Sequence, residues 1–442
     1  MQYDYTRLFV SVHTMAKFVI EGGQPLNGEI EPIGNKNAVL KMMAAALLTT
    51  ETVIINNVPA ISDVLVMAEI LQDLGATVIH DKKNKILEIN AASVKKTVIK
   101  SELAKKLRAS NTLLGPLLAR FGTVTSTLPG GDKIGPREMN AHFDGLSQLG
   151  AHISFLSDDI FCLKGRLRGQ SVFLYEPSVT ATENVMLAAV LTSGTTTVDN
   201  AAAEPHVRAL AEMLNSMGAK IQGAGTNRLI IEGVKKIAGT TVTTPPDFIY
   251  IGTMIVLAII TGGELKIRNV SAADIKPFEY FFGKLGARWH FQENVLIVPS
   301  RQTKKITDPV WARTKGIYSQ PWPCFPSDMM SLMIVLATQV KGSMLFFEKM
   351  YPGRMFFADY LNGLGANIVI ADPHRVIVNG SSILRGGKLF APDLRAGMAH
   401  VAAGLIAHGN TTVEAVEHID RGYPMIETTL QSLGAKIIRS QS

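Results

Sequence analysis

A Leu-Gly-Ala or Met-Gly-Ala triplet recurs six times along this chain of 442 residues, and it constrains the fold more than any other feature. Each triplet ends an amphipathic stretch and precedes a short β-prone run. A glycine in this place supplies the left-handed conformation that stops a helix, so every triplet predicts a helix followed by a strand. A repeat of about 70 residues is too long for a solenoid and indicates copies of one α/β unit. The glycines are Gly75, Gly150, Gly218, Gly286, Gly365 and Gly434.

A second feature recurs at the same period. An almost wholly apolar stretch rich in Ala, Leu and Met precedes a strand in each unit, and this composition favours helix over strand. A helix that is apolar on every side is buried, and these stretches are shorter than the ~20 residues that a membrane span requires. The six stretches are 38–48, 111–121, 183–193, 251–261, 328–338 and 395–407.

These repeats predict an α/β fold of six βαβαββ-type units, three in each of two domains, with apolar helices inside and four-stranded sheets outside. The strand pair at 18–33 precedes the first apolar helix and must join a sheet elsewhere. We therefore expect one domain at 36–245 and a second at 246–442 that is completed by 15–35. Pro245-Pro246 is a linker signal, and residues 1–14 are interpreted as an N-terminal extension.

Composition and motifs exclude several classes of function. The net charge is +7 without a run of five basic residues, so we expect no nucleic-acid partner. The two cysteines, Cys162 and Cys324, are far apart and fit a reducing cytoplasm rather than a disulfide scaffold. Metal-ligand spacings and phosphate-binding glycine motifs are lacking, so we expect no metal and no nucleotide cofactor. We also expect no signal peptide and no membrane partner.

Polar residues concentrate just before the apolar helices. If these helices run parallel within a domain, their N-termini share one end, where free N–H groups attract anions. Lys36, Arg108 and Arg395 lie at such N-termini, where cations are otherwise disfavoured, and together they predict an anion site. Ser178 and Asp247 are interpreted as ordinary helix caps.

The loop 128–137, between a strand and an amphipathic helix, is rich in glycine and proline. Its composition predicts either a surface turn or a mobile lid. Asp132 in this loop is then either an exposed carboxylate or an acid that enters a closed site. Arginines recur at the equivalent place in other units, at Arg354 and Arg421.

Seven stretches together resemble the enolpyruvyl transferase family. The resemblance implies two inside-out α/β barrels with the active site between them. Within the family, the stretches resemble the branch that transfers the enolpyruvyl group of phosphoenolpyruvate to the 3-hydroxyl of UDP-N-acetylglucosamine by addition and elimination. The resemblance implies that this reaction releases phosphate and is the first committed step of peptidoglycan precursor synthesis. The stretches are GNKNAVL (34–40), LRAS (107–110), LPGGDKIGPR (128–137), FPSDM (325–329), GRM (353–355), DLRA (393–396) and HIDRGY (418–423).

The resemblance also assigns substrate contacts. Phosphoenolpyruvate carries a carboxylate and a phosphate, so several cations must hold it. The phosphate is assigned to Lys36, Arg137 and Arg421, of which Arg421 is shared with the carboxylate. The carboxylate is assigned to Arg354 and Arg395, and Asn37 positions substrate. The contacts implied for the UDP-sugar are Arg108, Arg137, Glu138, Met139, Asn140, Ala141, Ser178, Val179 and Met350.

Two carboxylates take the proton-transfer roles in this assignment. Asp328 matches the aspartate that deprotonates the sugar hydroxyl. Asp132 occupies the lid position where most members carry cysteine, and it is the implied general acid, which requires a raised pKa. Because fosfomycin alkylates that thiol, the aspartate predicts resistance to fosfomycin.

The sequence departs from the family pattern at three places. Phe248 and Tyr250 stand in a stretch that usually reads PDRIE, Pro352-Gly353 replaces Glu-Asn before Arg354, and a lysine usual near the nucleotide is replaced around Glu176-Pro177. Two alternatives therefore stay open. One is a transferase like the sister enzyme that makes 5-enolpyruvylshikimate 3-phosphate, and the other is a non-catalytic paralogue that binds a nucleotide-sugar.

Overall fold

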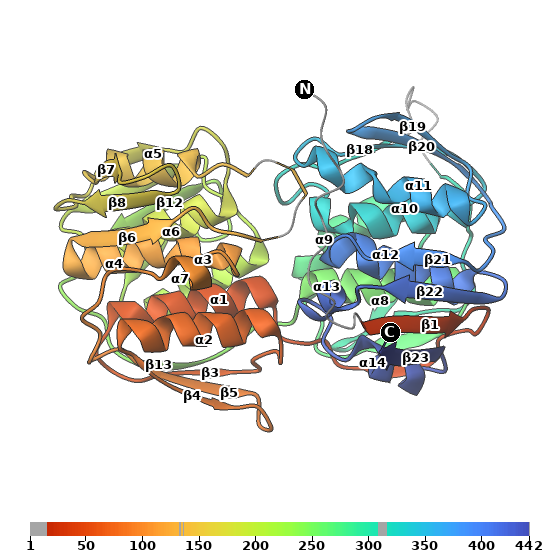
Figure 1. The fold of residues 1–442 in the computed structure, drawn as a ribbon, viewed down its shortest axis with the longest axis horizontal. Helices are drawn as coiled ribbons and strands as arrows, with labels where there is room; N and C mark the ends of the chain where they lie inside the picture. The colour runs from red at the N-terminus through yellow and green to blue at the C-terminus, as the bar shows by residue number, and fades with distance from the viewer. Residues whose placement is uncertain (1–15, 132–133, 136, 308–315, 442) are drawn as a thin grey trace.

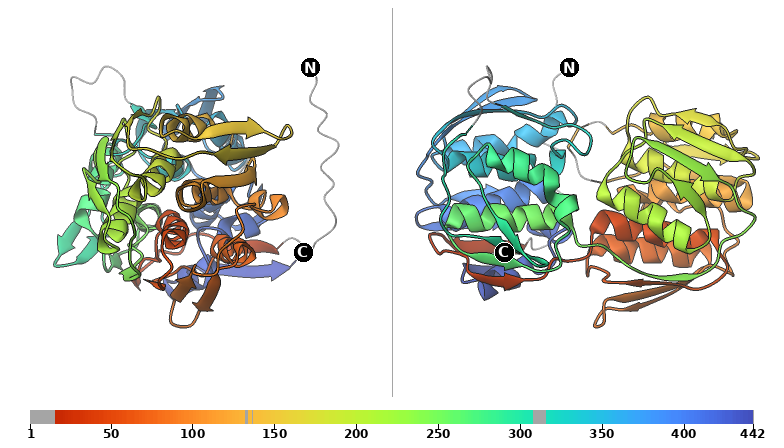
Figure 2. Two further views of the ribbon diagram at one scale, coloured as in Figure 1. Left: turned by 90° about the vertical axis from the view of Figure 1, so that its left-hand side faces the viewer. Right: turned by 180° about the vertical axis from the view of Figure 1, so that it is seen from behind.

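The computed structural model describes residues 16–131, 134–135, 137–307 and 316–441, which form two lobes side by side (Figure 1). The buried core of the first lobe extends from Ala38 to Ile237. That of the second extends from Phe248 to Ile437 and includes residues of the segment 18–30. Figure 2 shows helices in the interior of the lobes and strands around them, as the repeat predicts.

The sheets of the first lobe come from its three sequence repeats. One sheet has the order β13 (Thr240–Thr243), β3 (Val53–Asn56), β5 (Ile86–Asn90) and β4 (Thr77–Asp81). Another has the order β11 (Lys220–Gln222), β12 (Arg228–Glu232), β10 (Thr195–Asp199) and β9 (Ser171–Phe173). The third has the order β6 (Thr123–Thr127), β8 (Ile160–Lys164) and β7 (His152–Phe155).

The prediction of four strands is wrong for this third sheet. In each of the others an outer strand pairs in parallel with its neighbour. Here Val98 forms only an isolated parallel bridge with Thr125, at the place of that outer strand. The short helix α3 (Ser101–Ala104) follows at once, so the chain leaves the sheet before a strand can form.

The second lobe repeats the plan with strands from both ends of the chain. Its first sheet has the order β15 (His290–Gln292), β16 (Val295–Val298), β14 (Leu265–Ile267) and β2 (Gly28–Ile30). Its second has the order β17 (Gly316–Tyr318), β18 (Gly342–Phe347), β20 (Arg375–Gly380) and β19 (Ile368–Asp372). The last has the order β21 (Lys388–Phe390), β22 (Asn410–Glu414), β1 (Ala16–Glu21) and β23 (Lys436–Gln441). The strand pair before the first apolar helix thus completes sheets of the second lobe.

All six apolar stretches are buried helices, as predicted. Their first and last turns are 3-10 helix in places, namely η1 (Ala46–Leu48), η2 (Arg108–Leu113) and η3 (Ser327–Met329). Apolar side chains cover every side of these helices, so each is enclosed by its neighbours and by the sheets. The helices are α1 (Lys36–Ala45), α4 (Leu114–Phe121), α6 (Val179–Val190), α8 (Phe248–Thr261), α10 (Met330–Thr338) and α12 (Leu394–Ile406).

The amphipathic helices lie outside them and end as the triplets predict. All six triplet glycines have a positive φ, between 77° and 109°, which L side chains rarely adopt. The helices are α2 (Ser62–Leu74), α5 (Asn140–Gln148), α7 (Pro205–Ser216), α9 (Ala272–Gly283), α11 (Phe357–Gly363) and α14 (Ile426–Ser432). The remaining helical turns are η4 (Pro352–Met355) and α13 (Glu417–Asp420).

The chain passes between the lobes along two adjacent segments. Gly34 and Pro246 form an antiparallel bridge, and the Asn35 N–H donates to the Pro245 carbonyl at 2.8 Å. The domain boundaries at 36 and 246 fall within this double crossing and stay a prediction. No helix in the described ranges is long and apolar enough to cross a membrane.

Candidate active site between the lobes

Asp247 and Asp393 cap buried helices of the second lobe. The Asp247 carboxylate accepts from the backbone N–H groups of Ile249, at 2.9 Å, and Tyr250, at 3.2 Å, as the sequence predicts. Asp393 accepts two such bonds, of 2.7 and 3.0 Å, at the start of α12. The same prediction is wrong for Ser178, because it precedes α6 but its side chain makes no capping hydrogen bond.

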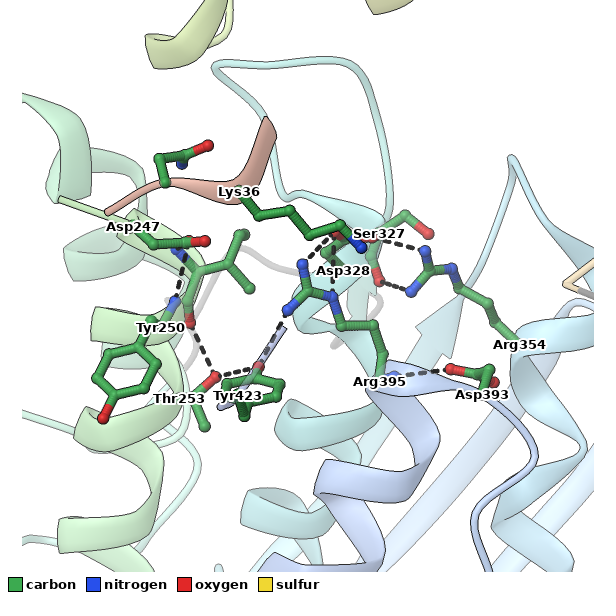
Figure 3. A network of polar contacts seen from close by, with 12 residues as sticks. Lys36, Asp247, Tyr250, Thr253, Ser327, Asp328, Arg354, Asp393, Arg395 and Tyr423 are labelled. Atoms are coloured by element: carbon green, nitrogen blue, oxygen red, sulfur yellow. Dashed lines mark hydrogen bonds and ion pairs between the residues drawn. The ribbon is translucent and has the colours of Figure 1, made fainter. Parts of the chain in front are cut away.

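Asp328, in η3 just before α10, is held by Arg354 of the same repeat and by Arg395 of the next repeat (Figure 3). Arg354 Nη2 lies 2.6 Å from Asp328 Oδ1. Arg395 Nη2 and Nε lie 2.8 and 3.2 Å from Oδ2. Burial raises the pKa of Asp328, but the charges and hydrogen bonds of Arg395 and Arg354 outweigh it and hold the pKa well below its usual range. The carboxylate is therefore charged and weakly basic while both guanidiniums contact it.

A chain of hydroxyl groups fixes Arg395 from the opposite side. Its Nη1 donates to the Tyr423 hydroxyl at 3.1 Å, and that hydroxyl lies 2.7 Å from Thr253 Oγ1. Thr253 in turn donates to the Ile249 carbonyl within α8. The guanidinium is thus held between the starts of three buried helices.

Asp63 joins two predicted phosphate contacts and was missed by sequence reasoning. Its carboxylate lies 2.7 Å from Lys36 Nζ and accepts from Arg421 Nε at 3.1 Å and Nη2 at 3.3 Å. Burial raises the pKa of Asp63, but Lys36 and Arg421 together lower it by more than burial raises it. The pKa therefore lies below its ordinary value. In the sequence, Asp63 reads as an ordinary acid in the first turn of α2, and only the fold brings Arg421 beside it.

A further pair of cations lies where the lid loop meets η2. Arg108 Nη2 donates to the Glu138 carbonyl at 3.1 Å. Burial and the positive charge of Arg137 lower the pKa of Arg108 to about 10. The two guanidiniums therefore repel each other, and an anion between them would relieve this repulsion.

The described part of the lid contacts the second lobe. The Gly353 N–H donates to the Ile134 carbonyl at 3.1 Å. A Cβ added at Gly135 would lie 3.1 Å from Pro352 Cδ, so the two segments are in close contact. Asp132, the proposed acid, lies outside the described residues.

Asp247 interacts both with Lys36, which pairs with Asp63, and with Arg395, which pairs with Asp328. Burial raises the pKa of Asp247, while the charge of Arg395 and hydrogen bonding from the Lys36 backbone oppose that rise. The backbone of Lys36 and the charge of Arg395 thus act on one carboxyl group from different lobes. In Figure 3 the Lys36 side chain extends toward Asp328 and Arg395. The predicted sharing of one region by the N-terminal ends of buried helices within a domain is met in the second lobe for α8, α10 and α12.

The other predicted contacts lie at the starts of α1, α5 and α6 and in nearby loops. Asn37 is half-buried in the first turn of α1, and Val179 is half-buried at the start of α6. The Asn140 amide, at the start of α5, donates to the Glu138 carboxylate. The remaining residues differ in exposure: Met139 and Ala141 are buried, and Met350 is 42% exposed.

Comparison with known proteins identifies the family. A family model described as EPSP synthase (3-phosphoshikimate 1-carboxyvinyltransferase) matches residues 20–430. UDP-N-acetylglucosamine 1-carboxyvinyltransferases of Treponema denticola and Bradyrhizobium diazoefficiens are each 45% identical to this chain. The matches cover 96% of this chain and 99% and 98% of those proteins. The chain belongs to the UDP-N-acetylglucosamine 1-carboxyvinyltransferase family.

Solved structures show that this family member has the enolpyruvyl transferase fold. The enolpyruvyl transferase NikO from Streptomyces tendae superposes with a TM-score of 0.86 at 23% identity, covering 97% of this chain and 100% of that one. EPSP synthase from Acinetobacter baumannii gives 0.72 at 19% identity, with the same coverage. The expected two-barrel architecture is therefore confirmed.

The departures from the family pattern form aromatic contacts in this member. The Phe248 ring lies 5.1 Å from that of Trp322 and stacks on His206 of the first lobe at 6.4 Å. The Tyr250 ring lies 5.9 Å from that of Tyr423, which holds Arg395. The Phe248–His206 contact therefore joins the two lobes, whereas the Tyr250–Tyr423 contact lies within the second lobe.

Within the described ranges, no three His, Cys, Asp or Glu side chains are grouped so that they could hold a metal ion. Both cysteines are free thiols. The cations and carboxylates described above can support binding of anions and transfer of protons.

Proposed function

We propose that this chain transfers the enolpyruvyl group of phosphoenolpyruvate to the 3-hydroxyl of UDP-N-acetylglucosamine and releases phosphate. The observation that carries the proposal is the carboxylate of Asp328 held between Arg354 and Arg395, in a region that also contains Lys36 and Arg421. A doubly anionic three-carbon acid fits such a group of cations. Relatives at 45% identity over nearly the whole chain carry the name of this activity.

The cations divide by position. Lys36, Arg137 and Arg421 would hold the phosphate, and Arg354 and Arg395 the carboxylate. Bidentate guanidinium contacts suit a planar carboxylate, and a lysine ammonium suits a phosphate as a point charge. The UDP-sugar would lie against the residues from Arg137 to Ala141, with Arg108 and Ser178 beside it.

Asp328 would accept the proton of the sugar hydroxyl. While both arginines contact it, its low pKa makes it a weak base. A substrate carboxylate that takes over one guanidinium removes part of this stabilisation, so the pKa of Asp328 rises and the base becomes stronger. The group that binds phosphoenolpyruvate would thus also activate the base.

The reaction needs a second proton transfer. The sugar oxygen bonds to C2 while C3 gains a proton, which we assign to Asp132 of the lid. The tetrahedral intermediate then loses phosphate and a C3 proton, which restores the double bond. Electrostatic stabilisation of the departing phosphate by Lys36 and Arg421 would lower this barrier.

Phosphate release tests the proposal. We expect release from phosphoenolpyruvate with UDP-N-acetylglucosamine as acceptor, and at least a hundredfold lower kcat for Asp328→Asn because the base is lost. Release with shikimate 3-phosphate as the acceptor would instead establish the activity of the sister enzyme. The solved EPSP synthase shares the fold of this chain. Binding of both substrates without release would establish a non-catalytic protein.

A further inference from the structure

The carboxylate of Glu348 is fully buried and accepts several hydrogen bonds. Its Oε1 accepts from Ser319 Oγ at 2.7 Å and from the backbone N–H groups of Met350, at 2.8 Å, and Tyr351, at 3.1 Å. Its Oε2 accepts from Ser327 Oγ at 2.7 Å. The side chain has 0% exposure. It touches none of the proposed substrate-binding cations through these bonds.

Glu348 thereby connects the two segments that carry the base and its arginine. Ser327 directly precedes Asp328 in η3. Met350 and Tyr351 lead into η4, which carries Arg354. Arg354 Nη1 also approaches the Ser327 carbonyl, at 3.4 Å. The two oxygens of one carboxylate thus fix both partners of the Asp328–Arg354 contact.

The backbone of Glu348 is itself anchored. Its N–H donates to the His374 carbonyl at 2.8 Å, and His374 Nδ1 lies 2.6 Å from its carbonyl oxygen. Residue 348 directly follows β18, so it is held by the sheet at the outside of the lobe. A buried carboxylate is unfavourable unless its oxygens are hydrogen-bonded, and here they accept four bonds. The hydrogen bonds to Ser327 and to the Met350–Tyr351 segment therefore explain why a glutamate is buried here.

We propose that Glu348 is a positioning residue that aligns Asp328, through Ser327, with Arg354 and with the sugar-binding segment at Met350. This proposal rests on the proposed function. It predicts that removal of the Ser327 hydroxyl lowers kcat by more than the accompanying loss of stability explains. It also predicts that charge at residue 348 is less important than shape, because a glutamine can accept at one atom and donate to the Ser327 hydroxyl from the other.

A matched pair of serine variants separates positioning from stability. Ser327→Ala and Ser319→Ala each remove a 2.7 Å bond to Glu348, but only Ser327 adjoins Asp328. Ser319 also accepts from the Lys349 N–H, so its removal destabilises the fold at least as much. We expect Ser327→Ala to lower kcat about tenfold or more, and Ser319→Ala to lower it less than threefold. Equal kcat values for the two variants, or losses that follow their melting temperatures, would overturn the proposal.

Amide hydrogen exchange adds a readout that needs no turnover. Glu348→Ala is expected to speed exchange at Met350, Tyr351 and residues 327–329, and Glu348→Gln to leave it near that of the wild type. Unchanged exchange in a folded Glu348→Ala protein would also overturn the proposal. A wild type that releases no phosphate would contradict the proposed function, whereas an active wild type with unaffected Ser327→Ala kinetics would contradict this inference alone.

Discussion

Asp63 and Arg421 form a two-point ion pair between the lobes, with N–O distances of 3.1 and 3.3 Å, although 358 positions separate them in the sequence. The same carboxylate holds Lys36 at 2.7 Å. Asp63 is only 4% exposed, so water screens these charges little. The residue therefore sets the separation of two cations that are proposed to hold the substrate phosphate.

Asp63→Asn should impair use of phosphoenolpyruvate. Without the carboxylate, two half-buried cations repel each other and lose their common anchor. We expect KM for phosphoenolpyruvate to rise about 10- to 100-fold, since charged hydrogen bonds contribute ~1.5–3 kcal/mol. Steady-state kinetics with varied phosphoenolpyruvate measures this. Asp73→Asn, on the same helix and paired with Lys96 and Lys100, is the control and should leave KM unchanged.

Glu183 should make the folded state less stable as pH rises. Burial raises its pKa to about 7, although Lys41 Nζ lies 3.5 Å away and opposes the rise. Between the ordinary value of 4.5 and 7, the folded state holds a proton that the unfolded chain releases. The free energy of unfolding therefore falls with rising pH in this window, by up to about 3 kcal/mol.

Denaturant unfolding of wild type and Glu183→Gln at pH 5 and pH 8 measures this term. We expect the variant to gain stability relative to the wild type on going to pH 8. Glu212→Gln alters an exposed glutamate and should follow the wild type at both values. A constant difference between Glu183→Gln and the wild type across the range would show that Glu183 keeps one protonation state.

Gly353 should be required for contact between the lid and the second lobe. A Cβ added there would lie 2.9 Å from the backbone carbon and oxygen of Ile134, which forces the segments apart. We expect Gly353→Ala to lower kcat about tenfold through loss of lid closure. It should also abolish the substrate-induced slowing of hydrogen exchange over residues 128–135. Gly363→Ala, where a Cβ meets nothing within 4 Å, is the control.

Asp132 predicts the response to fosfomycin. The wild type lacks a thiol at this lid position and should keep its activity in stoichiometric fosfomycin. Asp132→Cys should acquire one covalent adduct, detected by intact-protein mass, and lose activity in parallel. Asp158→Cys places a thiol on the exposed surface of the same lobe and should stay unmodified. Rapid inactivation of the wild type would refute the assignment.

Several features of the fold could be predicted from the sequence because they depend on local order. The six triplet glycines end helices through their own backbone conformation, and the apolar helices are buried because every side of them is apolar. The cap at Asp247 is local in the same way. Ser178 shows the limit of this reasoning: it has the right residue type before a helix, but its side chain does not cap.

Long-range contacts decided what local patterns could not. The sequence by itself determined the repeat, the buried helices and the set of arginines, since these follow from periodicity and residue type. Only the tertiary structure placed Asp63 between Lys36 and Arg421 and gave Glu348 its four donors. Asp63 and Arg421 come from different repeats, and Ser319 is 29 positions from Glu348 within one repeat. The geometry of both sets of contacts depends on how complete units fold and pack, which no short stretch of sequence records.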